Sequence, residues 1–206
     1  MGKSTRIPEH LAPHPGTPLM FAGNPLLERL SHVSPVTVLA LFLPATIALF
    51  VTALMHGTVL TTTVALFLAG IAFWTLFEYV FHRFVFHLEP TSPFKLRLQF
   101  VIHGVHHQYP EDKTRLVMPV TVSIPLSLLM LWGFLALLGE YGWGFFSGFM
   151  AGYLGYDMLH YAVHHVRDAR NPWFRRLQQH HLAHHFRDTQ RGFGVSSPLW
   201  DLVFRS

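Results

Sequence analysis

Histidine is the residue type in this 206-residue chain that best indicates chemistry, because the chain has 16 histidines, 11 acidic residues and no cysteine. Twelve of the histidines lie between residues 82 and 185, in four groups: His82 and His87; His103, His106 and His107; His160, His164 and His165; and His180, His181, His184 and His185. Neutral imidazole binds iron, copper, zinc and nickel. The lack of cysteine excludes thiolate metal sites and disulfides. Ten or so histidine ligands are too many for one ion, so we predict a histidine-only site for two metal ions.

Most of these histidines have the spacing of one helix face. Residues three or four apart share a face, as His103 does with His107, and His160 with His164. His82 and His87 are five apart, so we expect that they bind different edges of the site or that the helix is distorted there. Ser92-Pro93 and Asn171-Pro172 have the pattern of helix starts, and each predicted helix ends in His-x2-His-His.

The histidine pattern repeats after 78 residues. The repeat relates His82, His103, His106 and His107 to His160, His181, His184 and His185. Two similar halves that face each other around a pseudo-two-fold axis would enclose two metals. The repeat pairs His87 with His165, whereas helix geometry favours His164 as the partner of His160. The choice between His164 and His165 therefore stays open, and we follow the geometry.

Four apolar segments must position these histidines, over residues 36–54, 58–77, 117–138 and 141–159. Each is close to the ~20 residues that a helix needs to cross a bilayer. Half of the chain is hydrophobic and 13% is charged, where soluble domains carry about a quarter charged residues. A chain of this length cannot bury four such helices on all sides. We predict an all-α integral membrane protein with four transmembrane helices in two hairpins, with residues 35–206 as the membrane-embedded domain.

The basic residues predict the orientation. All 15 lysines and arginines lie before, between or after the two hairpins, and none lies in the hairpin loops around residues 55–57 and 139–140. The positive-inside rule then places both termini and the histidine groups in the cytosol, the latter in a helical cap. Residues 1–34 form a polar cytosolic segment without an early apolar run, so we expect no cleaved signal peptide. Because topology accounts for the net charge of +4, we expect no nucleic-acid partner.

Several blocks together resemble one known family. They are His82-Arg83-Phe84-Val85-Phe86-His87, His103-Gly104-Val105-His106-His107, Gly155-Tyr156-Asp157, His160-Tyr161-Ala162-Val163-His164-His165, His181-Leu182-Ala183-His184-His185, Gly192-Phe193-Gly194-Val195-Ser196 and Trp200-Asp201. The order resembles the fatty acid hydroxylase and sterol desaturase superfamily, and is most similar to fatty acid 2-hydroxylases. The resemblance covers most of the chain after about residue 25.

The resemblance implies a dimetal oxygenase that inserts one oxygen atom of O2 into a lipid C–H bond. The expected position is carbon 2 of a fatty acid, or of an acyl group in a sphingolipid-like lipid. The implied metal ligands are His82, His87, His103, His106, His107, His160, His164, His181, His184 and His185. His165 and His180 are further candidate ligands, and the alternative is that they orient the other ligands. We expect iron, because zinc has no redox chemistry, although zinc can occupy the same imidazoles.

Ligand histidines usually donate their other N–H to a carboxylate or carbonyl. Glu78 lies four residues before His82, and Asp157 lies three before His160. We expect these two carboxylates to support the ligands, with Tyr161 as a further candidate. Tyr156, Asp188 and Asp201 are weaker candidates.

The chain differs from many relatives in lacking a fused cytochrome b5 domain, and we expect no covalently fused haem. Electrons would come from a separate donor of the cytochrome b5 or ferredoxin type, and the lipid substrate from the membrane. Aromatic residues in 73–81 and 141–149 are candidates to line the lipid's path or to anchor the helices at the membrane surface. One alternative function is a sterol or carotenoid hydroxylase or desaturase of the same superfamily. Another is a non-enzymatic membrane metal-binding protein, although the four segments lack the row of polar residues that a transport path needs.

Overall fold

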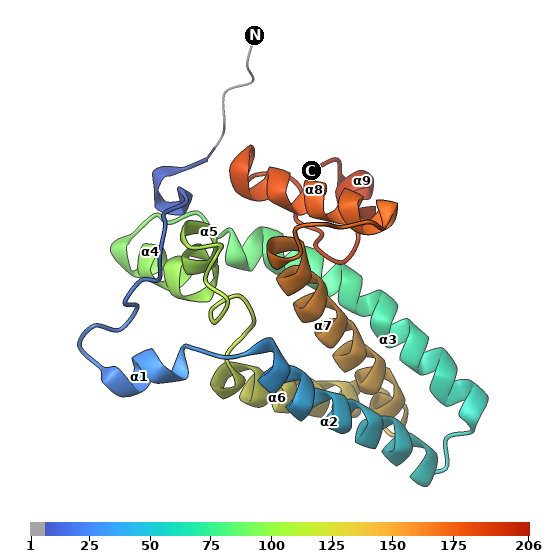
Figure 1. The fold of residues 1–206 in the computed structure, drawn as a ribbon. Coiled ribbons are helices and arrows are strands. Elements are labelled where there is room, and N and C mark those ends of the chain that lie inside the picture. Colours follow the sequence, from blue (N-terminus) through green and yellow to red (C-terminus); the bar gives the residue numbers. More distant parts are fainter. Residues whose placement is uncertain (1–6) are drawn as a thin grey trace.

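The computed structural model describes residues 7–206, and the regular elements in this range are helices (Figure 1). Residues 1–6 of the predicted N-terminal segment lie outside the described residues. The four long helices are α2 (Pro35–Met55), α3 (Leu60–Phe81), α6 (Val120–Leu138) and α7 (Tyr141–His165). The short helices are α1 (Pro25–Leu30), α4 (Pro93–Gln99), α5 (Val105–Gln108), α8 (Pro172–Phe186) and α9 (Leu199–Phe204). A 3-10 turn, η1, spans Glu9–Leu11, and two π-helical turns, η2 and η3, span His82–Phe86 and Phe100–Gly104.

Three helices are long and apolar enough to cross a membrane: α2, α3 with its extension through Phe86, and α6. The prediction of apolar helices of membrane-spanning length is confirmed for these three. The fourth predicted span lies in α7, which does not meet the same criterion of length and composition. Helix α7 packs against α2, α3 and α6, so it buries small residues such as Gly144, Ser147 and Gly148 where an outer helix carries large apolar ones.

The packing of α3 against α7 depends on two glycines. A Cβ atom at Gly148 of α7 would overlap the backbone carbonyl of Phe67, and one at Gly70 of α3 would overlap the carbonyl of Phe145. Small residues let helix backbones approach closely. Helix α3, which leads into His82, and helix α7, which carries His160, are therefore held side by side (Figure 1).

Aromatic side chains fill the space between the long helices. Trp74 of α3 meets Phe149 of α7 edge to face, with ring centroids 4.9 Å apart. Phe42 of α2 meets Tyr153 of α7 in the same way at 5.6 Å. Edge-to-face contacts of this kind add to the stabilisation from apolar burial, so α7 is fixed against α3 and α2.

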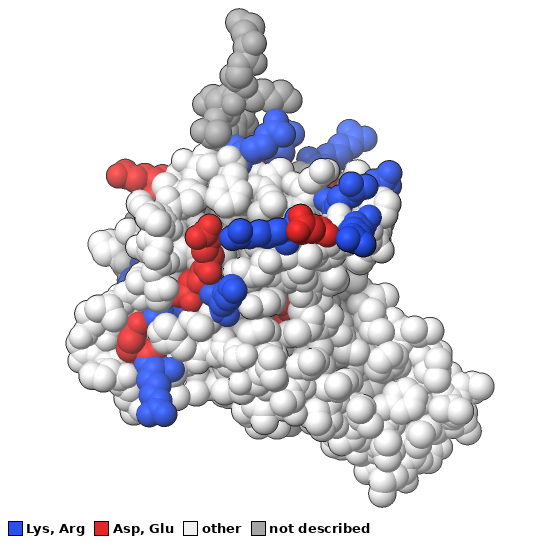
Figure 2. Space-filling view, in the orientation of Figure 1, with Lys and Arg blue, Asp and Glu red and all other residues white. Residues whose placement is uncertain are grey.

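The two hairpin loops lie together at the end of the molecule away from the short helices. His56, after α2, forms an ion pair of 2.6 Å with Glu140, before α7. Lysine and arginine side chains gather at the other end, around the short helices, and the far part of the long helices carries none in the view of Figure 2. The charge separation that the sequence predicts is therefore present in the folded molecule.

The predicted helix starts are confirmed. The Ser92 side chain accepts a hydrogen bond from the Lys95 amide at 3.2 Å, and Pro93 is the first residue of α4. Asn171 accepts from the Trp173 amide at 2.9 Å, and Pro172 begins α8. Helix α8 continues through its histidines, whereas α4 ends at Gln99 and the chain reaches His103 through the π turn η3.

A π turn also separates His82 from His87. The His87 amide donates to the His82 carbonyl at 3.1 Å, which is the five-residue hydrogen bond of a π-helix. The helix distortion that the five-residue spacing suggests is therefore present. The wider turn lets two histidines five residues apart face the same side.

Candidate metal centre

Ten histidines come together in two groups. Within each group one ring nitrogen from every residue lies within 4.8 Å of the others. The first group is His82, His87, His103, His107 and His184, and the second is His106, His160, His164, His181 and His185. The ten residues are those that the sequence resemblance implies as ligands. His165 and His180 belong to neither group.

Each half of the repeat contributes one histidine to the group of the other half. His106 belongs to the first half of the repeat but lies in the second group. His184 belongs to the second half but lies in the first group. His107 and His185, which the repeat relates, stack between the groups with ring centroids 4.0 Å apart and an interplanar angle of 12°. The two halves thus face each other as predicted, and neither half completes a group alone.

The open choice between His164 and His165 has a geometric answer in this arrangement. Helix α7 is regular through His165, so His160 shares a face with His164, four residues on. The Nε2 atom of His164 lies 2.9 Å from that of His181. His165 packs on Tyr161 instead, with ring centroids 4.5 Å apart. The 78-residue repeat pairs His87 with His165 because the π turn η2 adds one residue between His82 and His87, the two histidines of the first half.

The spacing of the ring nitrogens fits bound metal ions. The Nε2 atoms of His82 and His107 each lie 3.0 Å from that of His103, and His160 Nε2 lies 3.0 Å from His181 Nε2. For bonds of ~2.1 Å, two ligands at right angles would be ~3.0 Å apart. Each group therefore has the donor atoms and the spacing to hold one ion.

Burial keeps these imidazoles in the form that binds metals. It lowers the pKa of His103, His107 and His181 well below the ordinary histidine value, and neighbouring imidazoles lower it further. Neutral imidazole has a free nitrogen lone pair. The Nε2 atoms of His106 and His185 are buried and have no hydrogen-bond partner among the described residues. Because buried polar atoms are normally satisfied, these unpartnered nitrogens support a metal-binding role.

Two of the histidines are oriented by backbone carbonyls. His82 Nδ1 donates to the Phe193 carbonyl at 2.5 Å, and His184 Nδ1 donates to the Arg191 carbonyl at 2.7 Å. A hydrogen bond at Nδ1 fixes the tautomer and leaves the Nε2 lone pair free. In both residues Nε2 is the atom that faces the first group.

Glu78 supports His82 in a different way from the direct contact that its position suggests. Its carboxylate accepts hydrogen bonds from the amides of Val195 and Ser196, at 2.6 and 2.8 Å, and from the Ser196 hydroxyl. It therefore holds the segment 193–196, which carries the Phe193 carbonyl to His82.

Asp201 holds the same segment from the other side. It accepts from the amides of Phe193 and Gly194 at 2.9 and 2.8 Å. His180 contacts Asp201 through Nε2 at 3.0 Å, so His180 orients this aspartate and not a histidine of the groups. Although Asp201 is a weaker candidate from the sequence, its contacts give it a larger part in the site.

The other residues that the sequence predicts to support the ligand histidines are Asp157, Tyr161, Tyr156 and Asp188. The Nδ1 atom of His160 has no hydrogen-bond partner among the described residues, so Asp157 does not orient it as expected. Tyr161 contacts His165, and the Tyr156 ring lies 5.5 Å from the His160 ring. Asp188 accepts from the Gln190 amide and pairs with Arg191 at 3.9 Å.

Backbone groups are the part of the site that reasoning from side chains missed. The carbonyls of Phe193 and Arg191 carry no residue-type signal, but the glycines beside them do. Gly192 has a φ of +78°, a conformation that glycine adopts without strain. A Cβ atom at Gly194 would overlap the Ser197 carbonyl. The Gly192-Phe193-Gly194 pattern was thus the available sign of a tight segment beside the histidines.

An apolar cavity of about 490 Å³ adjoins the histidines. Its lining includes His103, His106 and His160, together with the buried Asp157. The apolar lining from the long helices includes Trp74, Phe77, Phe81, Val122, Leu126, Met130, Phe149 and Met150. Several aromatic residues of the predicted stretches thus line a space next to the site. A cavity of this size and polarity suits a lipid chain.

The family model and the individual relatives that match this chain agree with one another. The sequence model of the fatty acid hydroxylase family matches residues 67–206. The chain is 38% identical over 166 residues to dihydroceramide fatty acyl 2-hydroxylase FAH1 of Arabidopsis thaliana, covering 80% of this chain and 69% of that protein. It is 40% identical over 144 residues to fatty acid 2-hydroxylase of Homo sapiens, covering 68% of this chain and 39% of the human protein.

A solved structure has the same fold. Full-length scs7p, in which only the hydroxylase domain is visible, superposes with a TM-score of 0.82 at 36% identity, covering 89% of this chain and 69% of that one. The ceramide very long chain fatty acid hydroxylase SCS7 of Saccharomyces cerevisiae is 42% identical over 144 residues, 68% of this chain and 37% of the yeast protein. By sequence, histidine arrangement and fold, this chain belongs to the fatty acid hydroxylase family.

Proposed function

We propose that this protein is a membrane monooxygenase that hydroxylates carbon 2 of a lipid acyl chain. The observation that carries the proposal is the position of two five-histidine groups beside an apolar cavity. The names of the relatives, fatty acid 2-hydroxylase and dihydroceramide fatty acyl 2-hydroxylase, support this position and this class of substrate. The reaction places one atom of O2 in a C–H bond and releases the other as water, so it consumes two electrons and two protons.

We further propose that the ten histidines hold two iron ions. Iron, when bound by these imidazoles, supplies the redox chemistry for O2 activation, which zinc lacks. The residues of the chain position the reaction. The cavity binds the acyl chain and excludes water, and the segment 193–196 keeps His82 in place. Electrons come from a separate protein of the cytochrome b5 or ferredoxin type.

We propose four membrane crossings, with the histidine cap and both termini on the cytosolic side. Helix α3 leads into His82 of the first group, and the last turns of α7 carry His160 and His164 of the second, so these two ends lie on the same side of the membrane. The two hairpin loops meet at the opposite end through His56 and Glu140. Helix α7 therefore returns across the bilayer beside α3, as its 25 residues permit. Residues 35–206 form the membrane-embedded domain in this proposal.

Lipid mass spectrometry of cells tests the reaction. Cells that express the wild type should contain acyl lipids with one added oxygen at carbon 2. Cells that express the double variant His103→Ala, His181→Ala should not, because each group then lacks a central imidazole. Metal-loaded wild-type protein in the membrane without such a product would contradict the acyl substrate. Oxidised sterols or carotenoids in the same extracts would then support the alternative substrates of the superfamily.

A further inference from the structure

Part of the cavity wall comes from residues that precede the region matched by the family model, which begins at residue 67. Met20, Phe21, Leu27 and Leu30 line the cavity together with residues that belong to the matched region. We propose that the segment Pro18–Ser31 is a wall of the lipid-binding cavity that helps to select the lipid, and that an ion pair between Arg115 and Glu28 holds this wall in place. The inference rests on the proposed function, because the occupant is the lipid on which the enzyme acts.

The wall lies at an open edge of the cavity. Leu27 and Leu30 line the cavity and still have 44% and 41% of their surface exposed. Val122 of α6 and Val85 of the π turn η2 also line it and are exposed. Large apolar side chains that are exposed at such an edge mark a binding site for an apolar partner. The acyl chain of a lipid, entering from the bilayer that surrounds α6, has the matching chemistry.

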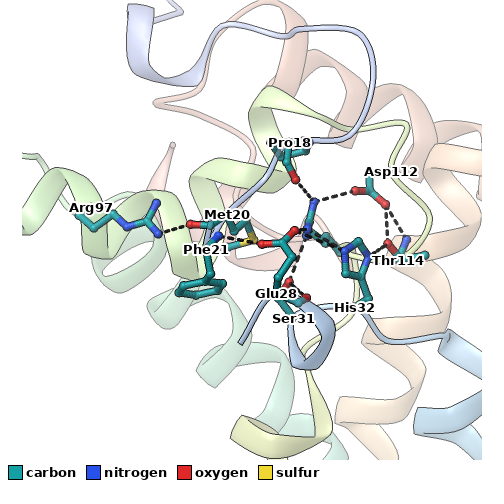
Figure 3. Close-up of polar contacts among 10 residues, drawn as sticks. Pro18, Met20, Phe21, Glu28, Ser31, His32, Arg97, Asp112 and Thr114 are labelled. Carbon is teal, nitrogen blue, oxygen red and sulfur yellow. Dashed lines mark hydrogen bonds and ion pairs between the residues drawn. The ribbon is translucent and has the colours of Figure 1, made fainter. Parts of the chain in front are cut away.

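Arg115 lies in the connection between α5 and α6 and holds the segment through Pro18 and Glu28, which Figure 3 shows beside Asp112. Its guanidinium is buried, and the carboxylate of Glu28 on α1 is its closest partner. It also donates to the Pro18 carbonyl at 2.5 Å and pairs with Asp112 at 3.3 Å. Arginine stays charged in proteins, so a buried guanidinium needs these acceptors. One cation thus fixes the start of the segment and the helix that follows it.

Two further contacts hold the part of the segment that reaches the cavity. Glu28 accepts a hydrogen bond from the Phe21 amide at 2.7 Å. Arg97 of α4 donates to the Met20 carbonyl and lies 5.4 Å from the centre of the Phe21 ring (Figure 3). Both cavity-lining residues, Met20 and Phe21, are therefore held through their backbones. The width that they leave for a lipid depends on the Glu28 and Arg97 contacts.

Single cysteines test the wall directly, because the chain has none of its own. Leu27→Cys places a thiol in the cavity lining, and Leu26→Cys places one on the neighbouring residue, which is 66% exposed and does not line the cavity. The full chain in lipid nanodiscs is treated with a bulky maleimide, with and without stearic acid or N-stearoyl dihydrosphingosine. We expect at least one of these lipids to slow labelling several-fold at Leu27→Cys and to leave Leu26→Cys unchanged.

The results separate this inference from the proposed reaction. Equal labelling of Leu27→Cys with and without both lipids would overturn the wall, even if the wild type hydroxylates acyl chains. Protection of Leu27→Cys in a protein that yields no hydroxylated lipid would support the wall and contradict the reaction. An equal effect of lipid at both cysteines would also overturn the wall, because it would reflect the surrounding bilayer.

A second variant tests the ion pair. Glu28→Gln, in the Leu27→Cys background, should raise the labelling rate without lipid several-fold, because Arg115 loses its charged partner on α1. In the otherwise native chain it should raise KM for the lipid and leave kcat nearly unchanged. The control is Glu140→Gln at the far end of the long helices, which should change neither. Glu28→Asp, which keeps the charge, should restore most of the native KM. Native labelling and native KM in a folded Glu28→Gln protein would overturn the role of the ion pair.

Discussion

His106 and His184 are the residues whose positions say most about the site, because each lies among the histidines of the other half. His106 stands within 4.5 to 4.7 Å of the rings of His160, His164 and His185, measured between centroids. A ligand supplied across the repeat makes each proposed metal group depend on the folding of both halves. The loss of one such histidine should therefore weaken one group selectively.

The change His106→Ala should remove metal from the second group and leave the first occupied, since the first keeps all five histidines. His165→Ala should leave both occupied, because His165 lies outside the groups. Metal analysis of the purified proteins, with lipid hydroxylation measured on the same samples, checks both expectations. Metal loss in His165→Ala equal to that in His106→Ala would contradict the choice of His164 as the ligand.

Asp201→Asn tests the support of His82 through the segment 193–196. The aspartate accepts two backbone hydrogen bonds, from Phe193 and Gly194, and an asparagine amide NH2 cannot accept one. We expect metal affinity to fall by about 10–100-fold, the usual effect of losing a partner of a metal ligand. Competition with a chelator measures it. Glu140→Gln is the control, because Glu140 lies at the far end of the long helices. Equal affinities in both variants would refute this role.

At the scale of elements, sequence spacing indicated one of the two helix irregularities and missed the other. Five residues between His82 and His87 indicated a distortion, and the structure places a π turn there. The spacing could not predict that η3 is also a π turn, because His103 and His107 are four apart and fit a regular helix.

Long-range partners were also beyond sequence reasoning. The carboxylate of Glu78 was recognised as important from its place one turn before His82. Its hydrogen-bond partner Val195 lies 117 residues away in the chain, so only the fold brings them together. Helix α7 was predicted as a span from its apolar length, although its glycines lower its mean hydropathy. These glycines allow close contact with α3, and the sequence does not show which helix becomes the neighbour of α7.

Helix contact gives a prediction about stability. Gly148→Ala should destabilise the protein by about 1–3 kcal/mol, the usual effect of overpacking, because the new methyl group meets the Phe67 carbonyl. Gly155→Ala, on the same helix, meets nothing within 4 Å and should be neutral or slightly stabilising, since alanine favours helix. Thermal unfolding in detergent compares them. A melting temperature for Gly148→Ala equal to that of Gly155→Ala would contradict close contact of the two backbones.

The whole molecule has an apolar body and one charged end (Figure 2). The histidines of the two groups belong to η2 and the residue after it, η3, α5, the last turns of α7 and α8, and Figure 1 places α5 and α8 at that end. The cavity is lined by residues of α3, α6 and α7 and also by three histidines. In the proposed function, a lipid leaves its chain among these apolar side chains while one end reaches the histidine groups. The proposal places the charged end at a membrane surface, and the positive-inside rule predicts the cytosolic one.

The orientation can be measured with single cysteines in the cysteine-free chain. Glu140→Cys lies in the loop between α6 and α7, and Glu89→Cys lies in the exposed stretch after η2. A membrane-impermeant maleimide should label Glu140→Cys in intact cells and Glu89→Cys only after permeabilisation. The reversed result would place the histidines outside the cytosol, where no arginine-rich segment is expected. Labelling of both cysteines in intact cells would contradict the four-helix crossing. Glu140 would then lie on the same side of the membrane as His82, although its ion pair with His56 places it at the opposite end of α3.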